Sequence, residues 1–337
     1  MQVTSNPDIW CAVVNIYAAS KKAVSLWRKA EEKLTADCIP FETHYTGKDG
    51  NAMSQTFSAC EKGFRKFIAV GGDGTVHDVL EGIMSFVEGL GYQGQINLSD
   101  FTLAVIPVGS GNDWIKTAGI PKDVDKAASL FRNGIIMKQD VVKVSLLDPV
   151  SLPLENVRKV SYMANVGGVG LDARVCERVN KAKQRGRRGK KLYVSALLYN
   201  IIHRIPANAR VISDGNQVFA GSFLSMAFGI GKYSGGGMRQ TPDAEFDDGL
   251  LDMTIIPDLP LMKIAKEAPK LFNGRFLTVN ELITSRSRTI TVLPYDENLP
   301  CQYTAGEPVE VDGEVVGNAP VRFDVLDDQL NILTSGR

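Results

Sequence analysis

A glycine-rich turn at Gly71–Thr75 is the first segment that could do chemistry. It reads Gly-Gly-Asp-Gly-Thr, follows the apolar run Phe67–Val70 and precedes apolar residues at helical spacing. Glycines let a backbone approach a ligand, and a helix N-terminus favours a phosphate. Asp73 does not suit a loop that binds only anions, so it indicates a metal ion bridging to phosphates, or a proton acceptor. The alternative is a tight strand-to-helix turn capped by Asp73. The chain has no GxxxxGK[ST] run, which excludes a Walker-type P-loop.

A second turn of the same kind, Pro107–Trp114, ends the apolar run Leu103–Val108. It reads Pro-Val-Gly-Ser-Gly-Asn-Asp-Trp, with Ser110 as a hydroxyl donor and Asp113 as a carboxylate at the start of a helix. In α/β sheets, ligands bind beyond the carboxyl ends of the strands. We therefore expect the two turns to converge on one crevice.

The loop Pro242–Asp252 is rich in acids. Its five carboxylates belong to Asp243, Glu245, Asp247, Asp248 and Asp252. Hard oxygen ligands on a glycine-containing loop are what Mg²⁺ or Ca²⁺ requires, although the spacing is not that of an EF-hand. The alternative is a solvated acidic turn before a strand.

Two further carboxylates flank Gly313, in Asp312-Gly313-Glu314. Asp-Gly is typical of a type I′ hairpin turn, and such a turn can still present a carboxylate to a substrate. The chain has three histidines, of which only His77 lies in one of these motifs. A carboxylate is therefore the economical choice of base for an attacking hydroxyl.

Basic and apolar residues follow one another between residues 178 and 202. The segment 178–191 holds eight basic side chains and no acid. They are Arg178, Lys181, Lys183, Arg185, Arg187, Arg188, Lys190 and Lys191. Leu192–Ile202 is apolar over much of a helical circumference. This combination suits docking on an anionic membrane surface. The alternatives are a solvated loop before a core helix, or a helix that lines an acyl-chain pocket between two domains.

The elements that must position these residues change in character near residue 141. Before it, apolar runs, glycine turns and helical patterns alternate, which predicts an open α/β domain with a mostly parallel sheet and helices on both faces. After it, strand-like segments dominate, and helical patterns cover only about 172–201 and 260–272. The second domain is therefore predicted to be β-rich, antiparallel and sandwich-like.

The expected boundaries are 1–140 for the α/β domain and 141–317 for the β-rich domain. The pattern does not assign the segment 318–337 to either domain, and packing of this segment on the first domain is one of the two alternatives. Within it, the alternation Val321–Val325 and the run Leu330–Leu333 have the pattern of one more hairpin.

Composition and charge restrict the classes of function. The chain has 44% hydrophobic and 23% charged residues and a formal net charge of zero, so no global basic field indicates nucleic acid. Its five cysteines have no CxxC-type spacing, which argues against a disulfide framework or a zinc site and suits a reducing cytoplasm. No signal-peptide pattern opens the sequence, and no run approaches ~18 apolar residues. We expect a soluble, cytoplasmic protein.

As a set, the motifs resemble the diacylglycerol-kinase catalytic domain that lipid, sphingosine and ceramide kinases share. GGDGTVHDVLEGI is followed by PVGSGNDW, in a layout similar to that of the bacterial YegS/DgkB/BmrU lipid kinases. The resemblance continues, in family order, through Asn165–Asp172, Gly235–Gly237, Pro242–Asp252 and Val311–Glu314. GGDGT alone also occurs in NAD kinases, which lack the GSGND and DDGLLD elements.

The resemblance implies a nucleotide site. Its phosphate-binding loop would consist of Gly71, Gly72, Asp73, Gly74, Thr75, Val76 and His77, and the second turn would add Gly109, Ser110, Asn112 and Asp113. Thr46 would be a further contact, as would Asn15. The family's NPxSG loop reads Asn15-Ile-Tyr-Ala-Ala here and keeps only the asparagine.

The resemblance also implies magnesium and a base. The Asp248 side chain, with the carbonyls of Glu245 and Leu250, would hold a structural Mg²⁺, whereas the catalytic Mg²⁺ would arrive with ATP. Glu314 is the favoured base and Asp312 the close alternative. Asp73 is the third catalytic candidate.

The implied function is that of a kinase, which transfers the γ-phosphoryl group of ATP to a hydroxyl of diacylglycerol or a related lipid. ATP would bind between the nucleotide-binding first domain and the lipid-substrate second domain. Two alternatives stay open: a kinase of a soluble substrate, similar to NAD kinases, and a non-catalytic nucleotide- or lipid-binding regulator. The expected partner is a lipid at a membrane surface, with peripheral contact at the inner face through 178–191. The oligomeric state stays open, a homodimer included.

Overall fold

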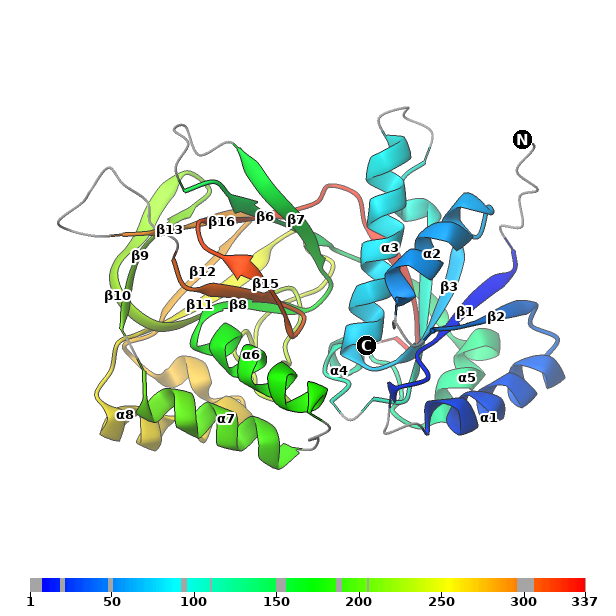
Figure 1. Ribbon diagram of the computed structural model, residues 1–337, viewed down its shortest axis with the longest axis horizontal. Helices are drawn as coiled ribbons and strands as arrows, with labels where there is room; N and C mark the ends of the chain where they lie inside the picture. The colour runs from blue at the N-terminus through cyan, green and yellow to red at the C-terminus, as the bar shows by residue number, and fades with distance from the viewer. Residues whose placement is uncertain are drawn as a thin grey trace. The chain divides into compact units, whose positions relative to one another are not determined.

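A computed structural model describes most of the chain (Figure 1). The described residues are 8–18, 22–47, 51–91, 96–109, 111–149, 156–185, 190–204, 206–295 and 306–336. The chain divides into two compact units, 1–141 with 327–337, and 142–326. It therefore passes from one unit to the other twice.

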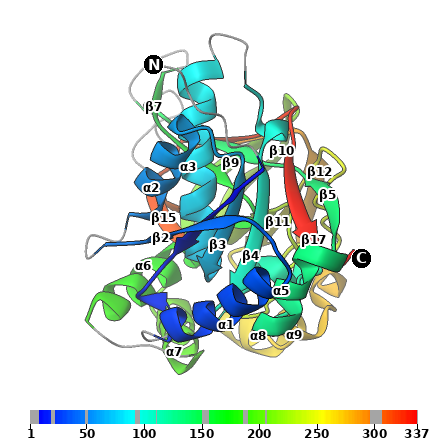
Figure 2. The ribbon, with the colours of Figure 1, turned by 90° about the vertical axis from the view of Figure 1, so that its right-hand side faces the viewer.

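The first unit is a six-stranded α/β sheet with the order β2-β1-β3-β4-β17-β5. Its strands are β1 (Trp10–Val14), β2 (Phe41–Tyr45), β3 (Lys66–Gly71), β4 (Thr102–Pro107), β5 (Ile135–Gln139) and β17 (Leu330–Thr334). All pairs are parallel except β17 with β5. Helices α1 (Ala23–Ala36) and α5 (Val124–Asn133) cover one face, and α2 (Ala52–Glu61) and α3 (Asp73–Gly91) the other (Figure 2).

Burial of the central strands explains why their sequences are continuous apolar runs. Phe67, Ile68, Ala69 and Val70 of β3 are all fully buried, because helices cover both faces of a parallel sheet. A short helix, α4 (Trp114–Thr117), follows the second glycine turn. The first unit thus presents its polar turns only where the strands end.

The second unit is an eleven-stranded antiparallel sheet. Its strands are β6 (Val142–Leu147), β7 (Val157–Met163), β8 (Val166–Gly170), β9 (Ala207–Ser213), β10 (Asn216–Gly229), β11 (Leu251–Pro257), β12 (Ile283–Ser287), β13 (Thr289–Pro294), β14 (Pro308–Val311), β15 (Glu314–Asn318) and β16 (Val321–Val325). The main path is β15-β14-β8-β10-β9-β13-β16-β6-β7, and β11 pairs with β10 and β12. The sheet curls around its own apolar core, in which the rings of Phe228 and Phe323 stack with centroids 4.3 Å apart.

Helices cover part of the outside of this sheet. They are α6 (Leu171–Gln184), α7 (Lys190–Ile202), α8 (Leu261–Glu267) and α9 (Lys270–Asn273). A second, smaller core joins α6, α7 and α8 to Leu224 of β10. The helical pattern predicted over 172–201 therefore forms two helices.

The predicted fold class is confirmed: a mixed, mostly parallel α/β sheet precedes an antiparallel β unit. The predicted hairpin of Val321–Val325 with Leu330–Leu333 is wrong. Strand β16 pairs with β13 and β6, whereas β17 pairs with β4 and β5. For this reason the chain returns to the first unit at Asp327, rather than at residue 318.

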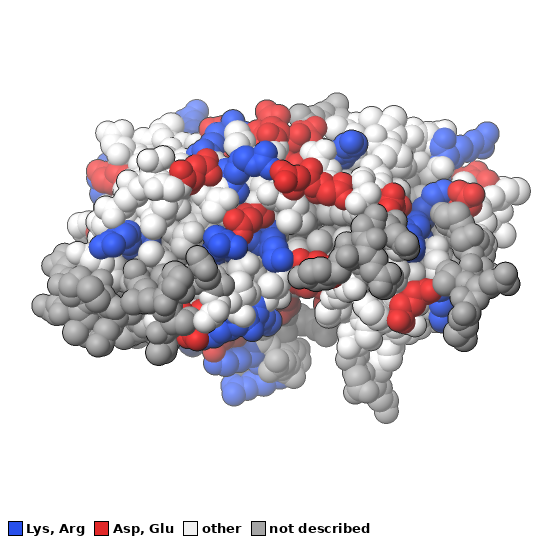
Figure 3. All heavy atoms as spheres, turned by 90° about the horizontal axis from the view of Figure 1, so that it is seen from above, with Lys and Arg blue, Asp and Glu red and all other residues white. Residues whose placement is uncertain are grey.

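Charged side chains of both signs are interspersed on the face shown in Figure 3, in keeping with the net charge of zero. None of the helices formed by the described residues is long and apolar enough to cross a membrane.

Candidate functional site

The first glycine turn joins β3 directly to α3. Gly72 O accepts hydrogen bonds from Thr75 N (2.9 Å) and Val76 N (3.2 Å), so the helix starts within the turn. A Cβ atom on Gly71 would collide with the Thr75 side chain. Gly71 is therefore required by the tight path of the chain, and Gly74, Val76 and His77 follow in the first turns of α3.

The two glycine turns meet at one edge of the sheet. Val108 N and Gly109 N both donate to Gly71 O, at 2.9 and 3.1 Å. A Cβ atom on Gly109 would lie 2.5 Å from Gly72 Cα. The convergence expected from the motif positions is thus present, and the backbones approach so closely that Gly109 cannot carry a side chain without a shift of Gly72.

Asp73 links the two turns. Its Oδ1 accepts a hydrogen bond from Trp114 N at 3.0 Å, across 41 residues of sequence. The carboxylate thus contacts the first residue of α4, in addition to lying in its own turn. A charged group remains at the point where the two turns meet.

Asn112 contributes an unsatisfied acceptor to the same turn. Its φ of 54° lies in the left-handed region, and its Nδ2 donates to Gly109 O at 2.9 Å. Its Oδ1 is buried without a hydrogen-bond partner among the described residues. Asp113 beside it is buried and accepts from Lys116 Nζ at 2.5 Å. Ser110 lies outside the described residues.

Asn15 and Thr46 join this edge from the ends of β1 and β2. Asn15 Nδ2 donates to Thr75 Oγ1 at 3.1 Å, and Thr46 Oγ1 accepts from Ile16 N at 3.4 Å. His77 is buried, with Nε2 3.7 Å from Glu81 Oε1. Except for Ser110, the residues predicted to bind nucleotide therefore lie at or directly behind one edge of the first unit.

In the second unit, Asp312 and Gly313 form the turn of the β14–β15 hairpin. Both have positive φ, 51° and 90°, as a type I′ turn requires. Asp312 Oδ2 accepts from Ala164 N (2.8 Å), and Oδ1 accepts from Asn165 N (2.9 Å) and Val166 N (3.2 Å). The Asp312 carboxylate therefore fastens the hairpin to the bend between β7 and β8.

Glu314, two residues further on, has an exposed side chain. Its Oε2 accepts a single described side-chain hydrogen bond, from Asn180 Nδ2 of α6 at 3.1 Å. Of the two acids predicted to share the role of base, Glu314 is therefore the one whose carboxylate is accessible to a substrate hydroxyl.

Two buried carboxyl groups beneath this turn were not predicted as site residues. Glu310 is 5% and Asp172 6% exposed. Burial, and then the charge of Asp172, raise the pKa of Glu310 well above its usual value. Burial also raises the pKa of Asp172, against hydrogen bonds from Gln240 Nε2 (2.7 Å) and Ser225 Oγ (3.0 Å).

Two features of the backbone accommodate the buried Glu310 side chain beneath the turn. Gly313 N donates to Glu310 Oε2 at 2.7 Å, so the buried carboxyl supports the turn that carries Glu314. Glu310 pairs across the sheet with Gly168, which has no side chain to fill the space. The sequence signal is an acid between two apolar strand residues, Val309 and Val311, opposite a glycine-rich strand.

The Asp248 carboxylate, which was predicted to hold a magnesium ion, already has hydrogen-bond partners within the protein. Asp248 Oδ1 accepts from Leu250 N at 3.0 Å, and Asp248 Oδ2 is hydrogen-bonded to Arg286 Nη2. Arg286 Nε also donates to Asp252 Oδ2 at 3.1 Å. In the part of the chain that the structure describes, no group of three or more His, Cys, Asp or Glu side chains is placed to hold a metal ion. Ligation of Mg²⁺ by the Asp248 side chain with the carbonyls of Glu245 and Leu250 stays a prediction, and in this structure the Arg286 guanidinium supplies the positive charge beside Asp248.

The basic and apolar segments lie on α6 and α7. The Arg178 guanidinium lies 3.6 Å from the Tyr199 ring centroid, and Lys181 pairs with Glu177 at 2.6 Å. The side chains of Lys183, Arg187, Arg188, Lys190 and Lys191 lie outside the described part. On α7, Val194, Leu198 and Ile202 are 49%, 54% and 61% exposed. Their spacing of four residues places them on one face of the helix.

Two family models match the sequence. One, described as the diacylglycerol kinase catalytic domain, matches residues 10–144. The other, described as the YegS C-terminal NAD kinase beta sandwich-like domain, matches residues 165–334.

Individual relatives are similar at low identity. A diacylglycerol kinase of Mycobacterium tuberculosis is 26% identical over 237 residues, 70% of this chain and 69% of the relative. A protein of Stenotrophomonas maltophilia named "Probable lipid kinase YegS-like" is 27% identical over 311 residues, 89% of this chain and 90% of the relative. A crystal structure of a diacylglycerol kinase from Bacillus anthracis covers 98% of both chains with a TM-score of 0.68 and 18% identity. That structural likeness concerns the fold alone.

Proposed function

Because the chain belongs to the family that joins a diacylglycerol kinase catalytic domain to a YegS-type C-terminal domain, we propose that it is an ATP-dependent lipid kinase. It transfers the γ-phosphoryl group to a hydroxyl of diacylglycerol or a related lipid. The family supports phosphoryl transfer, and the site residues below support the assignment of individual roles.

The observation that carries this proposal is the meeting of two glycine turns at the carboxyl edge of the first unit's sheet. Gly71 O accepts from the backbone of the second turn, and Asp73 accepts from Trp114 N. The first turn of α3 offers a positive dipole end to phosphate groups. Asn15 and Thr75, hydrogen-bonded to each other, and the free acceptor of Asn112 supply polar contacts for the rest of the nucleotide.

Glu314 is the group that fits the role of base. Its carboxylate takes the proton of the lipid hydroxyl as the hydroxyl oxygen attacks the γ-phosphorus. The bond to the β-phosphate oxygen breaks, leaving ADP and the phosphorylated lipid. Asp312 holds the turn in place, since its oxygens already accept three backbone hydrogen bonds. When bound with ATP, Mg²⁺ supplies neutralisation of the phosphate charge.

We propose that the protein binds its lipid substrate at an anionic membrane surface. The apolar stripe of Val194, Leu198 and Ile202 supports this, together with Arg178 and Arg185 on the preceding helix and loop. An exposed apolar helix face beside basic residues binds the interface through both apolar burial and attraction to anionic lipids.

The test is transfer of γ-³²P from ATP, with Mg²⁺, to a panel of lipids in mixed micelles, resolved by thin-layer chromatography. NAD and a reaction without acceptor run in parallel. The matched variant is Asp73→Asn, which keeps an oxygen to accept from Trp114 N but removes the charge. A labelled lipid spot that this variant loses, at an unchanged unfolding temperature, is the expected result.

Other outcomes distinguish the rival functions. Label in NAD, with none in any lipid, replaces the lipid kinase with a kinase of a soluble substrate. ATP binding without transfer to any acceptor supports a non-catalytic regulator. The altered loop Asn15–Ala19, of which only Asn15 matches the family pattern, would then be the first segment to restore by mutation.

A further inference from the structure

Asn180 of helix α6 is the only described side chain that makes a hydrogen bond to the Glu314 carboxylate. Its Nδ2 donates to Glu314 Oε2 and to Gly313 O, each at 3.1 Å. A side-chain amide nitrogen carries two hydrogens, so it can make both bonds at once. The exposed carboxylate is therefore tied to the backbone of its own turn by a residue of another element.

The backbone of this turn is held by other groups. Gly313 N donates to Glu310 Oε2 at 2.7 Å. The Asp312 carboxylate accepts three backbone hydrogen bonds, which fasten the turn to the bend between β7 and β8. These bonds fix the backbone at Glu314 but do not restrain its side-chain torsions. Loss of the Asn180 amide is therefore expected to release the carboxylate rather than the turn.

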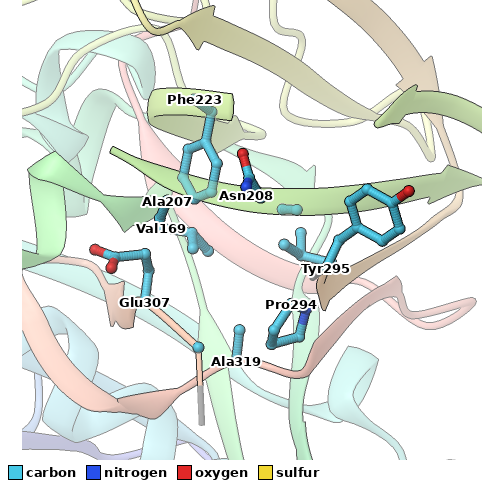
Figure 4. A pocket seen from close by; sticks show the side chains of 11 residues that line it. Val169, Ala207, Asn208, Phe223, Pro294, Tyr295, Glu307 and Ala319 are labelled. Carbon is cyan, nitrogen blue, oxygen red and sulfur yellow. The ribbon is translucent and has the colours of Figure 1, made fainter. Parts of the chain in front are cut away.

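Helix α6 gives Asn180 a fixed support. Near the start of the helix, Arg174 donates two hydrogen bonds to Glu307, at 2.7 Å from Nε and 2.6 Å from Nη2. Glu307 directly precedes β14, and Figure 4 shows it at the wall of a cavity of about 320 Å³ in the second unit. Val175 and Val179 of α6 are buried in the smaller core with α7 and α8. The helix is thus attached to the β14–β15 hairpin at two places, of which Asn180 is the second.

A neutral amide is well suited to orient a base. An exposed glutamate side chain samples many rotamers, whereas a base must lie within hydrogen-bond reach of the hydroxyl, about 2.6–3.2 Å. A lysine or arginine in place of Asn180 would neutralise the carboxylate, and an aspartate would repel it. The amide orients Glu314 through Oε2, and it leaves the negative charge and Oε1 to take a proton.

We propose that Asn180 is a positioning residue, whose amide holds the Glu314 carboxylate in the orientation that accepts the proton of the lipid hydroxyl. The inference rests on the proposed function, in which Glu314 is the base. Asn180 itself touches neither the lipid nor the nucleotide in this role and acts through Glu314. It lies outside every motif of the sequence, within the basic segment 178–191.

Steady-state phosphorylation of 1,2-dioleoylglycerol in mixed micelles, with ATP and Mg²⁺, tests this role in Asn180→Leu, which removes both N–H donors. We expect kcat to fall about 10–100-fold, as is usual when a residue that orients another functional group is lost. The KM for ATP should stay within about twofold of the wild type, because the predicted nucleotide-binding residues belong to the first unit. Asn180→Gln keeps the NH₂ group on a longer side chain and is expected to recover part of the loss. The matched control is Asn318→Leu, at the other end of β15, where Asn318 Nδ2 donates to Gly306 O at 2.9 Å, and it should keep the wild-type kcat.

The same substitution in a Glu314→Ala background separates positioning from a structural role. There, Asn180→Leu is expected to change the residual kcat by less than about twofold, because no carboxylate remains to be oriented. Equal losses of kcat in the two backgrounds, or a wild-type kcat in Asn180→Leu, overturn the positioning role and leave the kinase in place. A wild-type kcat in Glu314→Ala removes the base and its positioning residue together. Wild-type protein that labels no lipid removes the lipid kinase, and the role of Asn180 with it.

Discussion

Glu314 and Asp312 lie two residues apart, yet their carboxylates have opposite surroundings. One is exposed and held by a single amide of Asn180, and the other accepts three backbone hydrogen bonds. A base needs a free, accessible oxygen, whereas a carboxylate saturated by N–H groups stabilises a turn.

Glu314→Gln is therefore expected to lower kcat by ~10²–10⁴-fold, the usual contribution of a general base, with no change in unfolding temperature. Asp312→Asn should instead lower the free energy of unfolding by about 1–3 kcal/mol, because buried N–H groups lose a charged acceptor. Steady-state kinetics and urea unfolding of both variants distinguish the base from the carboxylate that stabilises the turn. Wild-type kcat in Glu314→Gln would transfer the role of base to Asp312.

Glu310 makes the stability of the second unit depend on pH. Above pH ~4.3 the unfolded chain ionises this carboxyl, whereas the folded protein keeps it protonated because its pKa is raised. The folded state then binds more protons, so the free energy of unfolding falls as pH rises toward the folded pKa. Its neighbours Asp172, Asp312 and Glu314 are all acids and act in the same direction.

Glu310→Gln removes this titration and keeps an oxygen that accepts from Gly313 N. It is expected to be more stable than the wild type at pH 8, with the difference shrinking toward pH 4 in urea unfolding curves. Glu61→Gln, at an exposed position of α2, is the control and should show no such difference. A wild-type pH profile in Glu310→Gln would mean that Glu310 is ionised in the folded protein.

At the scale of single residues, the sequence predicted site residues that lie in turns and missed Glu310 in strand β14 and Asp172 at the start of helix α6. Gly71, Asp73 and Gly109 follow from glycine spacing at the ends of two strands, whereas Asn112 was implied by the family resemblance. Glu310 and Asp172 could not be found in this way, since their role depends on a space left by Gly168 on a neighbouring strand.

The acidic loop is an element whose partner could not be predicted from its own sequence. Its composition predicts a cation, and the structure supplies one from β12, as the guanidinium of Arg286. Cross-strand pairing of Asp252 with Arg286 brings the two together, and no local pattern in residues 242–252 indicates it.

Arg286→Ala leaves Asp248 and Asp252 without their counter-charge. We expect the free energy of unfolding to fall by about 1–3 kcal/mol, and millimolar Mg²⁺ to raise the unfolding temperature of this variant more than that of the wild type. The control is Arg322→Ala, which removes an arginine paired with one aspartate, Asp324, at 2.7 Å. If the wild-type protein loses stability in EDTA and added Mg²⁺ restores it, the loop of the wild-type protein holds a metal ion beside Arg286.

Strand partners were the other feature that local patterns could not supply. Val321–Val325 has the alternating pattern of a strand and Leu330–Leu333 is a short apolar run. Both segments form strands. Which strands they pair with depends on segments more than a hundred residues earlier, Val142–Leu147 for β16 and Thr102–Pro107 for β17. Period and turn signals therefore predicted the elements and not their pairing.

For the whole molecule, composition predicted a globular protein without a global basic field. It could not predict where apolar side chains lie on the surface. Net charge says nothing about the apolar stripe of α7. The stripe is identified only from the exposed fractions of its side chains. The helical pattern could not show this, because residues on both faces of α7 are apolar.

Leu198→Ser combined with Ile202→Ser is expected to weaken binding to vesicles that contain anionic lipid by about tenfold or more, since two exposed apolar side chains lose ~1–3 kcal/mol of burial between them. Co-sedimentation at low and high salt measures it. Val218→Ser, on β10, is a control with comparable chemistry and 37% exposure. Unchanged vesicle binding in the double variant would remove α7 from the membrane contact.

The place of β17 has a consequence for the order in which the protein can be made. A ribosome delivers β17 only after every strand of the second unit, yet this strand lies between β4 and β5 in the first sheet. Until then, β4 has an open edge and β5 has no partner, so the sheet that carries the two glycine turns is incomplete throughout synthesis of the second unit. The first unit to emerge from the ribosome is thus the last to be finished, and its nascent sheet needs protection from other chains during that interval.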